Sequence, residues 1–479
     1  MVLVFRIDSW FENGSDLLEG VMQMSLIRCL SISLVGSVCG LLCAGEPQPS
    51  EKSTLKAPKA FVTKAVAANR VASVPDYVFA FEEEIEWIHF GIDSRSRFDI
   101  RDQDYRDAEL VSEGAFFQRS LVYLGAPGLL GPLGLATEFE DSRRALGHAN
   151  ASPNEVNPTE VLQAYGELRF DDALGGDPVS LRLGRMAFDS ADRRLISRNR
   201  YRNTINAFDG ARLRIGDESR PIEWDAFTLR PVNRSVDDLD ESSEESLLHG
   251  LTGYVRTFSP RVLIEPYWLL SDQAADGGKQ LHTGGVHTYG RIGRSSWDYD
   301  FDFVGQWGES GGLGHRAWAA HAEIGHSWDH PWEPRLGAWL NFASGDRDAG
   351  DSTSGRFDPL YGATFAFYGY SGYFSWQNIV NPALRLSFQP MENLRCEIIH
   401  RGIWLASEDD AWVRASRQDL LGSSGRYVGQ ELDLRAAWQA TRHLEIEAVY
   451  SCFFPGGFVD QSGPSPESHF GYLAATLRF

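Results

Sequence analysis

The chain ends in His469-Phe-Gly-Tyr-Leu-Ala-Ala-Thr-Leu-Arg-Phe479, and residue type alternates along this stretch. The face that includes Leu473, Leu477 and Phe479 is apolar, whereas the opposite face mixes aromatic and polar residues. Successive side chains of a β-strand point to opposite sides of the sheet. An apolar outer face, a mixed inner face and a terminal aromatic residue are typical of the last strand of a β-barrel in a membrane.

The same period of two recurs from about Phe81 to the C-terminus. In Trp297-Asp-Tyr-Asp-Phe-Asp-Phe303 the aromatic residues share one face and the aspartates share the other. The segment 431–438 alternates in the same way between Leu, Ala or Trp and charged residues. A strand of a soluble sandwich would bury the aromatic face. A barrel in lipid turns that face outward and places the charges on a wet lumen.

Counting such runs predicts 18 antiparallel strands. They lie near residues 84–101, 114–124, 133–142, 160–171, 179–188, 206–216, 221–231, 248–259, 261–271, 281–293, 296–308, 315–328, 333–345, 376–389, 393–405, 427–440, 442–453 and 469–479.

The connections between these strands alternate in length. Short turns follow the even strands, and mostly longer polar loops follow the odd ones, at 102–113, 143–159, 189–205, 232–247, 346–375, 406–426 and 454–468. Short periplasmic turns opposite long extracellular loops are the asymmetry of a transmembrane barrel. A propeller or β-helix would show an internal repeat, and the sequence has none. The fold prediction is therefore an all-β transmembrane antiparallel barrel of about 18 strands.

The N-terminal region carries a targeting signal. An apolar run from Leu26 to Ala44 has Arg28 near its start and ends in small residues. We interpret residues 1–45 as a signal peptide, with Met24 as a candidate true start. An N-terminal membrane anchor is the alternative. Residues 46–80 are predicted to form a periplasmic linker and 81–479 the barrel, which places the protein in the outer membrane of a Gram-negative-type bacterium.

Composition excludes some classes of function. The net charge of −21 argues against a nucleic-acid binder. Only Cys396 and Cys452 follow the signal, and a whole predicted strand separates their strands. We expect both to be free thiols.

Arginines dominate the basic residues of the predicted lumen face. Guanidinium groups keep their charge and bind carboxylates bidentately. A ring of them favours anions. The alternative is that they pair with lumen acids such as Asp99, Glu167 and Glu397 and fill the barrel. The lumen-phase arginines are Arg95, Arg97, Arg101, Arg169, Arg182, Arg212, Arg214, Arg385, Arg395, Arg401 and Arg435.

The segment 184–210 is unusually basic for an acidic protein. It contains Arg185, Arg193, Arg194, Arg198, Arg200 and Arg202. We expect this loop to fold into the barrel as a constriction. A solvated external loop is the alternative.

Several motifs resemble those of the alginate export porins of Gram-negative outer membranes, over roughly residues 85–479. They are Gly184-Arg185, Arg194-Leu195-Ile196, Phe208-Asp-Gly-Ala-Arg-Leu213, Asn341-Phe-Ala-Ser-Gly-Asp-Arg-Asp348 and Phe357-Asp-Pro-Leu360. The resemblance implies a monomeric 18-stranded barrel whose arginine-lined pore passes an anionic polyuronate outward. Within the matching motifs lie Arg185, Arg193, Arg194 and Arg212; Arg95 and Arg97 match the first-strand pattern.

Two enzyme-like signals are weak. Gly308-Glu-Ser-Gly-Gly312 matches the sequence motif of a nucleophile elbow. That motif requires a helix after the serine, but the alternation typical of a strand continues here. His326 and His330 have a loose metal spacing at a short turn and lack further ligands. We therefore expect no enzymatic activity and no cofactor.

One loop carries clustered carboxylates. Asp346, Asp348 and Asp351 form a candidate Ca²⁺ site. The alternative is a solvated acidic turn.

The sequence thus predicts a porin or exporter for an anionic polysaccharide of the alginate-like polyuronate type. The expected partners are this polysaccharide, outer-membrane lipid and periplasmic export proteins, with no nucleic acid. A general anion-selective porin for small solutes, an outer-membrane barrel enzyme and a structural barrel with a plugged lumen remain alternatives. Neutralising Arg193, Arg194 and Arg212 together is predicted to weaken anion selectivity.

Overall fold

The computed structural model describes residues 79–80, 88–107, 109–147, 150–259, 261–274, 277–419 and 423–479. The predicted signal peptide and almost all of the predicted linker lie outside this part of the chain. No helix among the described residues is long and apolar enough to cross a membrane.

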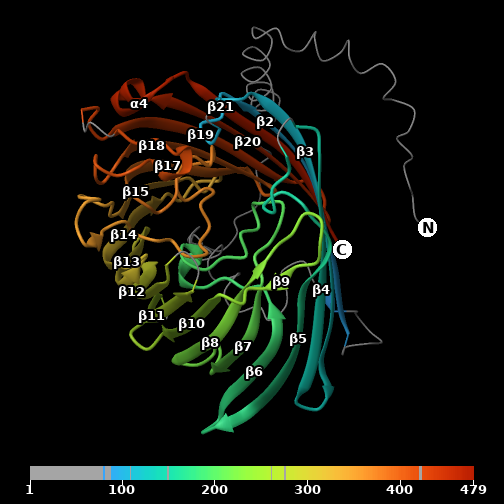
Figure 1. Ribbon diagram of the computed structural model, residues 1–479. Coiled ribbons are helices and arrows are strands. Elements are labelled where there is room, and N and C mark those ends of the chain that lie inside the picture. The colour runs from blue at the N-terminus through green and yellow to red at the C-terminus, as the bar shows by residue number, and fades with distance from the viewer. Residues whose placement is uncertain are drawn as a thin grey trace. The chain divides into compact units, whose positions relative to one another are not determined.

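The described chain forms one closed antiparallel barrel of 18 strands (Figure 1). In order around the barrel they are β2 (His89–Asp102), β3 (Glu113–Leu130), β4 (Leu133–Ala145), β5 (Asn157–Leu174), β6 (Asp177–Met186), β7 (Phe208–Ile215), β8 (Ile222–Asn233), β10 (Ser246–Val255), β11 (Val262–Gln273), β12 (Lys279–Arg291), β13 (Trp297–Ser310), β14 (Leu313–Ser327), β15 (Arg335–Ala343), β17 (Ile379–Met391), β18 (Leu394–Trp404), β19 (Tyr427–Gln439), β20 (Leu444–Pro455) and β21 (Ser468–Arg478). The predicted fold class and strand count are confirmed.

Several short elements accompany the 18 barrel strands. They are the two-residue strands β1 (Phe79–Ala80), β9 (Glu241–Ser242) and β16 (Thr353–Ser354), the 3₁₀ turns η1 (Ala191–Arg193) and η2 (Val413–Ala415), and the helix α4 (Gly457–Ser462).

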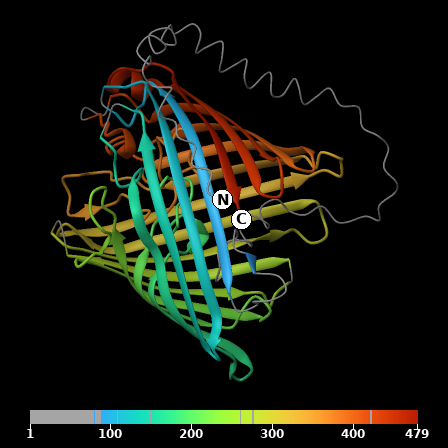
Figure 2. The same ribbon diagram turned by 90° about the vertical axis from the view of Figure 1, so that its right-hand side faces the viewer.

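Burial alternates along the strands as the sequence pattern predicts. On β13 the aspartates 298, 300 and 302 are buried inside, whereas Phe301 and Phe303 are 42% and 62% exposed on the outside. The strands run obliquely across the barrel wall (Figure 2). The outward phase is apolar because lipid solvates it, and the inward phase is polar because it faces the lumen.

Glycines make the tightest connections possible. Gly175 and Gly176 alone join β5 to β6, with φ of 67° and 93°. Gly311 and Gly312 alone join β13 to β14, with φ of 60° and 80°. Two successive positive φ values are the signature of a hairpin turn that favours glycine. The nucleophile-elbow spelling at 308–312 therefore has no catalytic geometry, because Ser310 ends a strand and enters a hairpin.

The C-terminal strand closes the barrel against β2. Their register runs from Asp93 opposite Arg478 to Asp102 opposite His469. The last residue takes part, because Ile92 donates its amide to the Phe479 carbonyl at 2.7 Å and accepts the Phe479 amide at 2.9 Å. The terminal stretch therefore satisfies an edge that would otherwise expose unpaired backbone groups to lipid.

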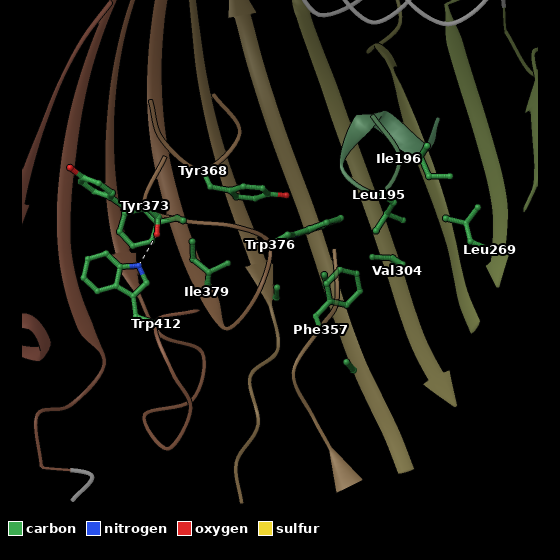
Figure 3. Packing of buried hydrophobic residues seen from close by; sticks show 14 of the residues in the cluster. Leu195, Ile196, Leu269, Val304, Phe357, Tyr368, Tyr373, Trp376, Ile379 and Trp412 are labelled. Carbon is green, nitrogen blue, oxygen red and sulfur yellow. Dashed lines mark hydrogen bonds between the residues drawn. The ribbon is translucent and has the colours of Figure 1, made fainter. Parts of the chain in front are cut away.

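The interior of the barrel contains a hydrophobic cluster (Figure 3). Leu269, Val304 and Ile379 contribute from the wall, and Leu195, Phe357 and Trp376 come from loops that enter the lumen. Trp412 donates its indole N–H to the Tyr373 carbonyl at 2.8 Å. A wide barrel would otherwise leave its lumen to water, so the loops supply a core that the strands do not.

A charge on the outer face should cost most near the middle of the wall. Phe303→Arg is expected to lower the free energy of unfolding in lipid vesicles by about 2–4 kcal/mol, because arginine is poorly solvated at the bilayer midplane. The matched substitution Trp297→Arg, at the end of β13, should cost about 0–1 kcal/mol near the interface. Equal losses in urea titrations would contradict this orientation of the wall.

Candidate functional site

Two loops fold into the lumen instead of extending outward. Inner loop 1 comprises residues 187–207 between β6 and β7, and inner loop 2 comprises residues 344–378 between β15 and β17. Inner loop 1 reaches β2, where Arg95 donates to the carbonyls of Arg200 at 2.9 Å and Arg202 at 2.7 Å. Arg119 on β3 donates to the Arg200 carbonyl at 2.8 Å.

Backbone hydrogen bonds join the two inner loops in the lumen. The Tyr361 amide donates to the Leu195 carbonyl at 2.9 Å, and the Ser197 amide donates to the Tyr361 carbonyl at 3.1 Å. Gly362 passes close to the Arg194 carbonyl, so that a Cβ at position 362 would lie 1.9 Å from that oxygen. The two loops therefore form one strap across the barrel, and a side chain at position 362 would push them apart.

The tip of inner loop 1 is conformationally strained. Asp192 and Arg193 are consecutive non-glycine residues with φ of 52° and 60°. Such conformations persist only where surrounding contacts over-determine them, and they cluster at functional sites. Arg194 supplies several of these contacts, because it bonds Asp192 at 3.0 Å and donates to Asn341 and Tyr368 at 3.3 Å each.

The loop tip borders a cavity of about 600 Å³. It extends from Arg193 to Glu392 and Asn393, which form the turn between β17 and β18 at the short-turn end of the barrel. Its charged lining consists of Arg193, Arg194, Arg385, Arg395 and Arg435 together with Asp192, Asp300, Glu323, Glu392, Glu397 and Glu445. Five arginines face six carboxylates, so the cavity is a mosaic of both charges.

Most of the predicted pathway arginines are paired with lumen carboxylates. The pairs are Arg182–Glu167 at 3.0 Å, Arg185–Asp209 at 2.9 Å, Arg194–Asp192 at 3.0 Å, Arg212–Asp225 at 2.5 Å, Arg214–Glu223, Arg385–Glu323 at 2.6 Å, Arg401–Asp433 at 2.7 Å and Arg435–Glu447 at 2.5 Å. Strand phase placed most of them on the lumen face, and Arg185 and Arg194 belong to the Arg-rich segment 184–210, but the sequence could not identify their partners.

Three arginines of β2 support the inner loops. Arg95, Arg97 and Arg101 donate to the backbone carbonyls of Arg200, Tyr201 and Ser371. Arg169 lies elsewhere, because it is exposed outside the cavity and pairs with Asp171, which is more exposed still.

Arg193 differs from all of these residues. It is half-buried, its guanidinium lies 5.4 Å from the Phe367 ring centroid, and no carboxylate among the described residues forms an ion pair with it. Arg194 beside it is fully engaged: burial by itself lowers the pKa of its guanidinium, but Tyr368 and Asp192 outweigh burial and hold that pKa above its ordinary value. Arg193 is thus the cavity arginine available to an anion.

The candidate calcium residues serve the local loop structure. Asp348 accepts the Gly350 amide at 3.0 Å, and Asp351 accepts the Thr353 amide at 2.6 Å. They are absent from the side-chain groups of the described chain whose ligand atoms converge. The calcium site remains a prediction.

The sequence reasoning missed one polar row on the lumen wall. Glu265, His287, Asp302, His321 and Asn341 lie opposite one another in register across β11 to β15. His287 bonds Asp300 at 2.7 Å and Glu265 at 3.3 Å. The strand phase of each residue was readable in the sequence, whereas their alignment into a row depends on the register between strands.

Cys396 and Cys452 form no disulfide with each other, as expected. His326 packs against Trp297 and Trp328, and His330 packs against Trp332 at the same rim.

Comparisons with known proteins agree with this architecture. A family model described as alginate export matches residues 86–472. Solved structures with a similar fold include OccK3 (OpdO) of Pseudomonas aeruginosa, with a TM-score of 0.56, 15% identity, and coverage of 84% of this chain and 98% of that one. OccAB1 of Acinetobacter baumannii has a TM-score of 0.56, 12% identity, and coverage of 82% and 97%. Pseudomonas aeruginosa OpdK, solved with vanillate, has a TM-score of 0.56, 12% identity, and coverage of 81% and 98%. No curated protein matches the chain in sequence.

Proposed function

This chain belongs to the alginate export family and is an outer-membrane porin or transporter, and from that premise we propose that it passes an anionic polysaccharide of the alginate-like polyuronate type through the lumen. The barrel acts as a monomer, selects its cargo without bond chemistry, and receives it from periplasmic export proteins. The observation that carries the proposal is the state of Arg193. This arginine lines the cavity at the end away from the β17–β18 turn, and it has no carboxylate partner among the described residues.

The charge mosaic of the cavity suits a polymer that must move. A continuous arginine surface would hold a polyanion at many points at once. Here Arg385 and Arg435 are each already paired with a glutamate, so a uronate can displace a partner only transiently. Binding that is weak and distributed over several sites allows passage from site to site.

Cavity size supports a second candidate function, a porin for small organic anions. A volume of about 600 Å³ falls within the range of about 300–1,000 Å³ that small-molecule sites occupy. OpdK, which shares the barrel fold, was solved with vanillate, a small carboxylate. Passage of a polymer would require the inner loops to move, whereas passage of a small anion would require a smaller movement of these loops.

Arg193→Gln is expected to raise the half-blocking concentration of oligouronates about tenfold in planar bilayers. This corresponds to about 1.4 kcal/mol, close to the lower end of the usual contribution of a hydrogen bond to a charged group. Reversal potentials under a salt gradient should show reduced anion preference. Arg193→Lys should recover part of both effects, because it keeps the charge and loses the bidentate geometry.

Arg169→Gln is the matched control, because Arg169 is exposed and lies outside the cavity lining. It should leave blockade and selectivity unchanged. Blockade by small carboxylates without blockade by oligouronates would favour the small-anion porin. Wild-type cation selectivity would contradict both candidates.

A further inference from the structure

The tip of inner loop 1 brings a carboxylate to two polar side chains of the barrel wall. Asp192 from η1, His287 from β12 and Asp300 from β13 are all buried, and one ligand atom of each lies within 4.8 Å of the others. Within the described residues they are the one group of three or more His, Cys, Asp or Glu side chains that converge in this way.

The surroundings of His287 match those of a metal-binding histidine. Its Nε2 atom faces the Asp300 carboxylate at 2.7 Å, and its Nδ1 atom faces Glu265 at 3.3 Å. A histidine that binds a metal through one ring nitrogen almost always donates the other N–H to a carboxylate or carbonyl, which fixes its tautomer and orientation. Glu265 is in place to perform this role for His287.

A second observation favours cation binding in this region. Asp302 lies opposite His287 in the β12–β13 register and is only 1% exposed, yet its Oδ2 atom has no hydrogen-bond partner. Its other oxygen accepts the Tyr267 hydroxyl at 2.8 Å. One buried region thus contains four carboxylates, those of Asp192, Asp300, Asp302 and Glu265. Arg194 is the permanent cation that contacts Asp192. Buried charges are costly unless they are paired or coordinate a metal.

We propose that Asp192, His287 and Asp300 bind one divalent transition-metal ion of the Zn²⁺ type. Zinc accepts imidazole nitrogen and carboxylate oxygen at about 2.0–2.2 Å, so its ligands lie at most roughly 4.4 Å apart. Small side-chain adjustments bring the three groups within this limit. Calcium fits less well because it takes six to eight oxygen ligands, whereas this site offers a nitrogen.

The ion would join the loop to the wall. Asp192 belongs to inner loop 1, and His287 and Asp300 belong to adjacent strands. Coordination would hold the strained conformation at Asp192 and Arg193, and with it the position of the Arg193 guanidinium at the cavity. The binding site stands independently of the transport proposal, because its test measures metal binding.

The test is to titrate Zn²⁺ into the chelator-treated barrel in detergent and to measure binding by calorimetry. The wild type should bind one ion. Asp192→Asn should weaken binding more than tenfold; asparagine tolerates the left-handed backbone at this position, so the loop should keep its shape. Glu265→Gln should weaken binding by about 10–100-fold through the orientation of His287.

Asp189→Asn is the matched control on the same loop. Asp189 is also buried, and its hydrogen bonds to Ser197 and to the Arg198 amide both use Oδ1, which asparagine retains. It should leave zinc affinity unchanged. Heat-modifiable migration on gels should verify that each variant is folded, and the visible absorption of bound Co²⁺ should report the coordination geometry. A folded wild type that binds no zinc, or equal affinity of the wild type and Asp192→Asn, would overturn the proposal.

Discussion

Arg401→Met is expected to destabilise the barrel by about 3–5 kcal/mol, because it leaves a buried carboxylate without its cation. Arg401 and Asp433 are both fully buried, and the guanidinium contacts the carboxylate at 2.7 Å. Glu431 lies directly opposite Arg401 in the β18–β19 register and is also fully buried. Removal of the arginine would therefore leave two acids side by side. Urea titration in lipid vesicles, followed by tryptophan fluorescence, measures the loss.

Two further variants isolate the charge from the packing. Arg401→Met combined with Asp433→Asn should recover much of the lost stability, because replacing both partners of a buried pair costs less than removing one. Arg169→Met removes an arginine from an exposed pair with Asp171 and should cost less than about 1 kcal/mol. A double variant as unstable as Arg401→Met alone would show that Arg401 acts through packing, for example against Trp339.

Deletion of residues 190–204 from inner loop 1 is expected to raise single-channel conductance several-fold and to reduce anion preference. Barrels of 16–18 strands leave an aqueous channel when nothing fills them. This segment lies across the lumen (Figure 1), because it contacts Arg95 on β2 at one end and Asn341 on β15 at the other. The barrel should still assemble, because β6 and β7 pair with each other from Val179–Ile215 to Met186–Phe208 without the loop. Arg95 and Arg119 would lose carbonyl partners but would gain water.

Deletion of residues 236–239 is the control for loop shortening. Asp237, Asp238 and Leu239 in this segment are exposed and make only short-range hydrogen bonds among the described residues. Conductance should stay at the wild-type value. If deletion of 190–204 leaves conductance unchanged in folded protein, then inner loop 2 alone limits the passage.

The two-residue alternation predicted the strands well, because one face of each barrel strand contacts lipid and the other faces the polar lumen. The predicted strand 296–308 corresponds to Trp297–Ser310, and 469–479 corresponds to Ser468–Arg478. Strand ends deviate where glycine turns are tight: β3 extends to Leu130 instead of ending at 124. Period and turn chemistry are local properties, so a single sequence displays them.

The candidate site was predictable only in part. The Arg-rich segment marked inner loop 1, and the phase of Arg212 and Arg401 placed both on the lumen face. Nothing in the sequence indicated that Asp225 and Asp433 would neutralise them. The predicted effect of neutralising Arg193, Arg194 and Arg212 together is now assigned mainly to Arg193, because the other two carry ion pairs.

The sequence alone determined the barrel, its strand count and the role of the terminal stretch 469–479 in closing it. These features follow from alternation and loop length, which are written along the chain. Tertiary structure decided which arginine remains available and which acids meet His287. Those outcomes depend on the register between strands and on two loops, 187–207 and 344–378, that meet inside the lumen. Residues brought together across the lumen from distant positions leave no periodic trace in the sequence.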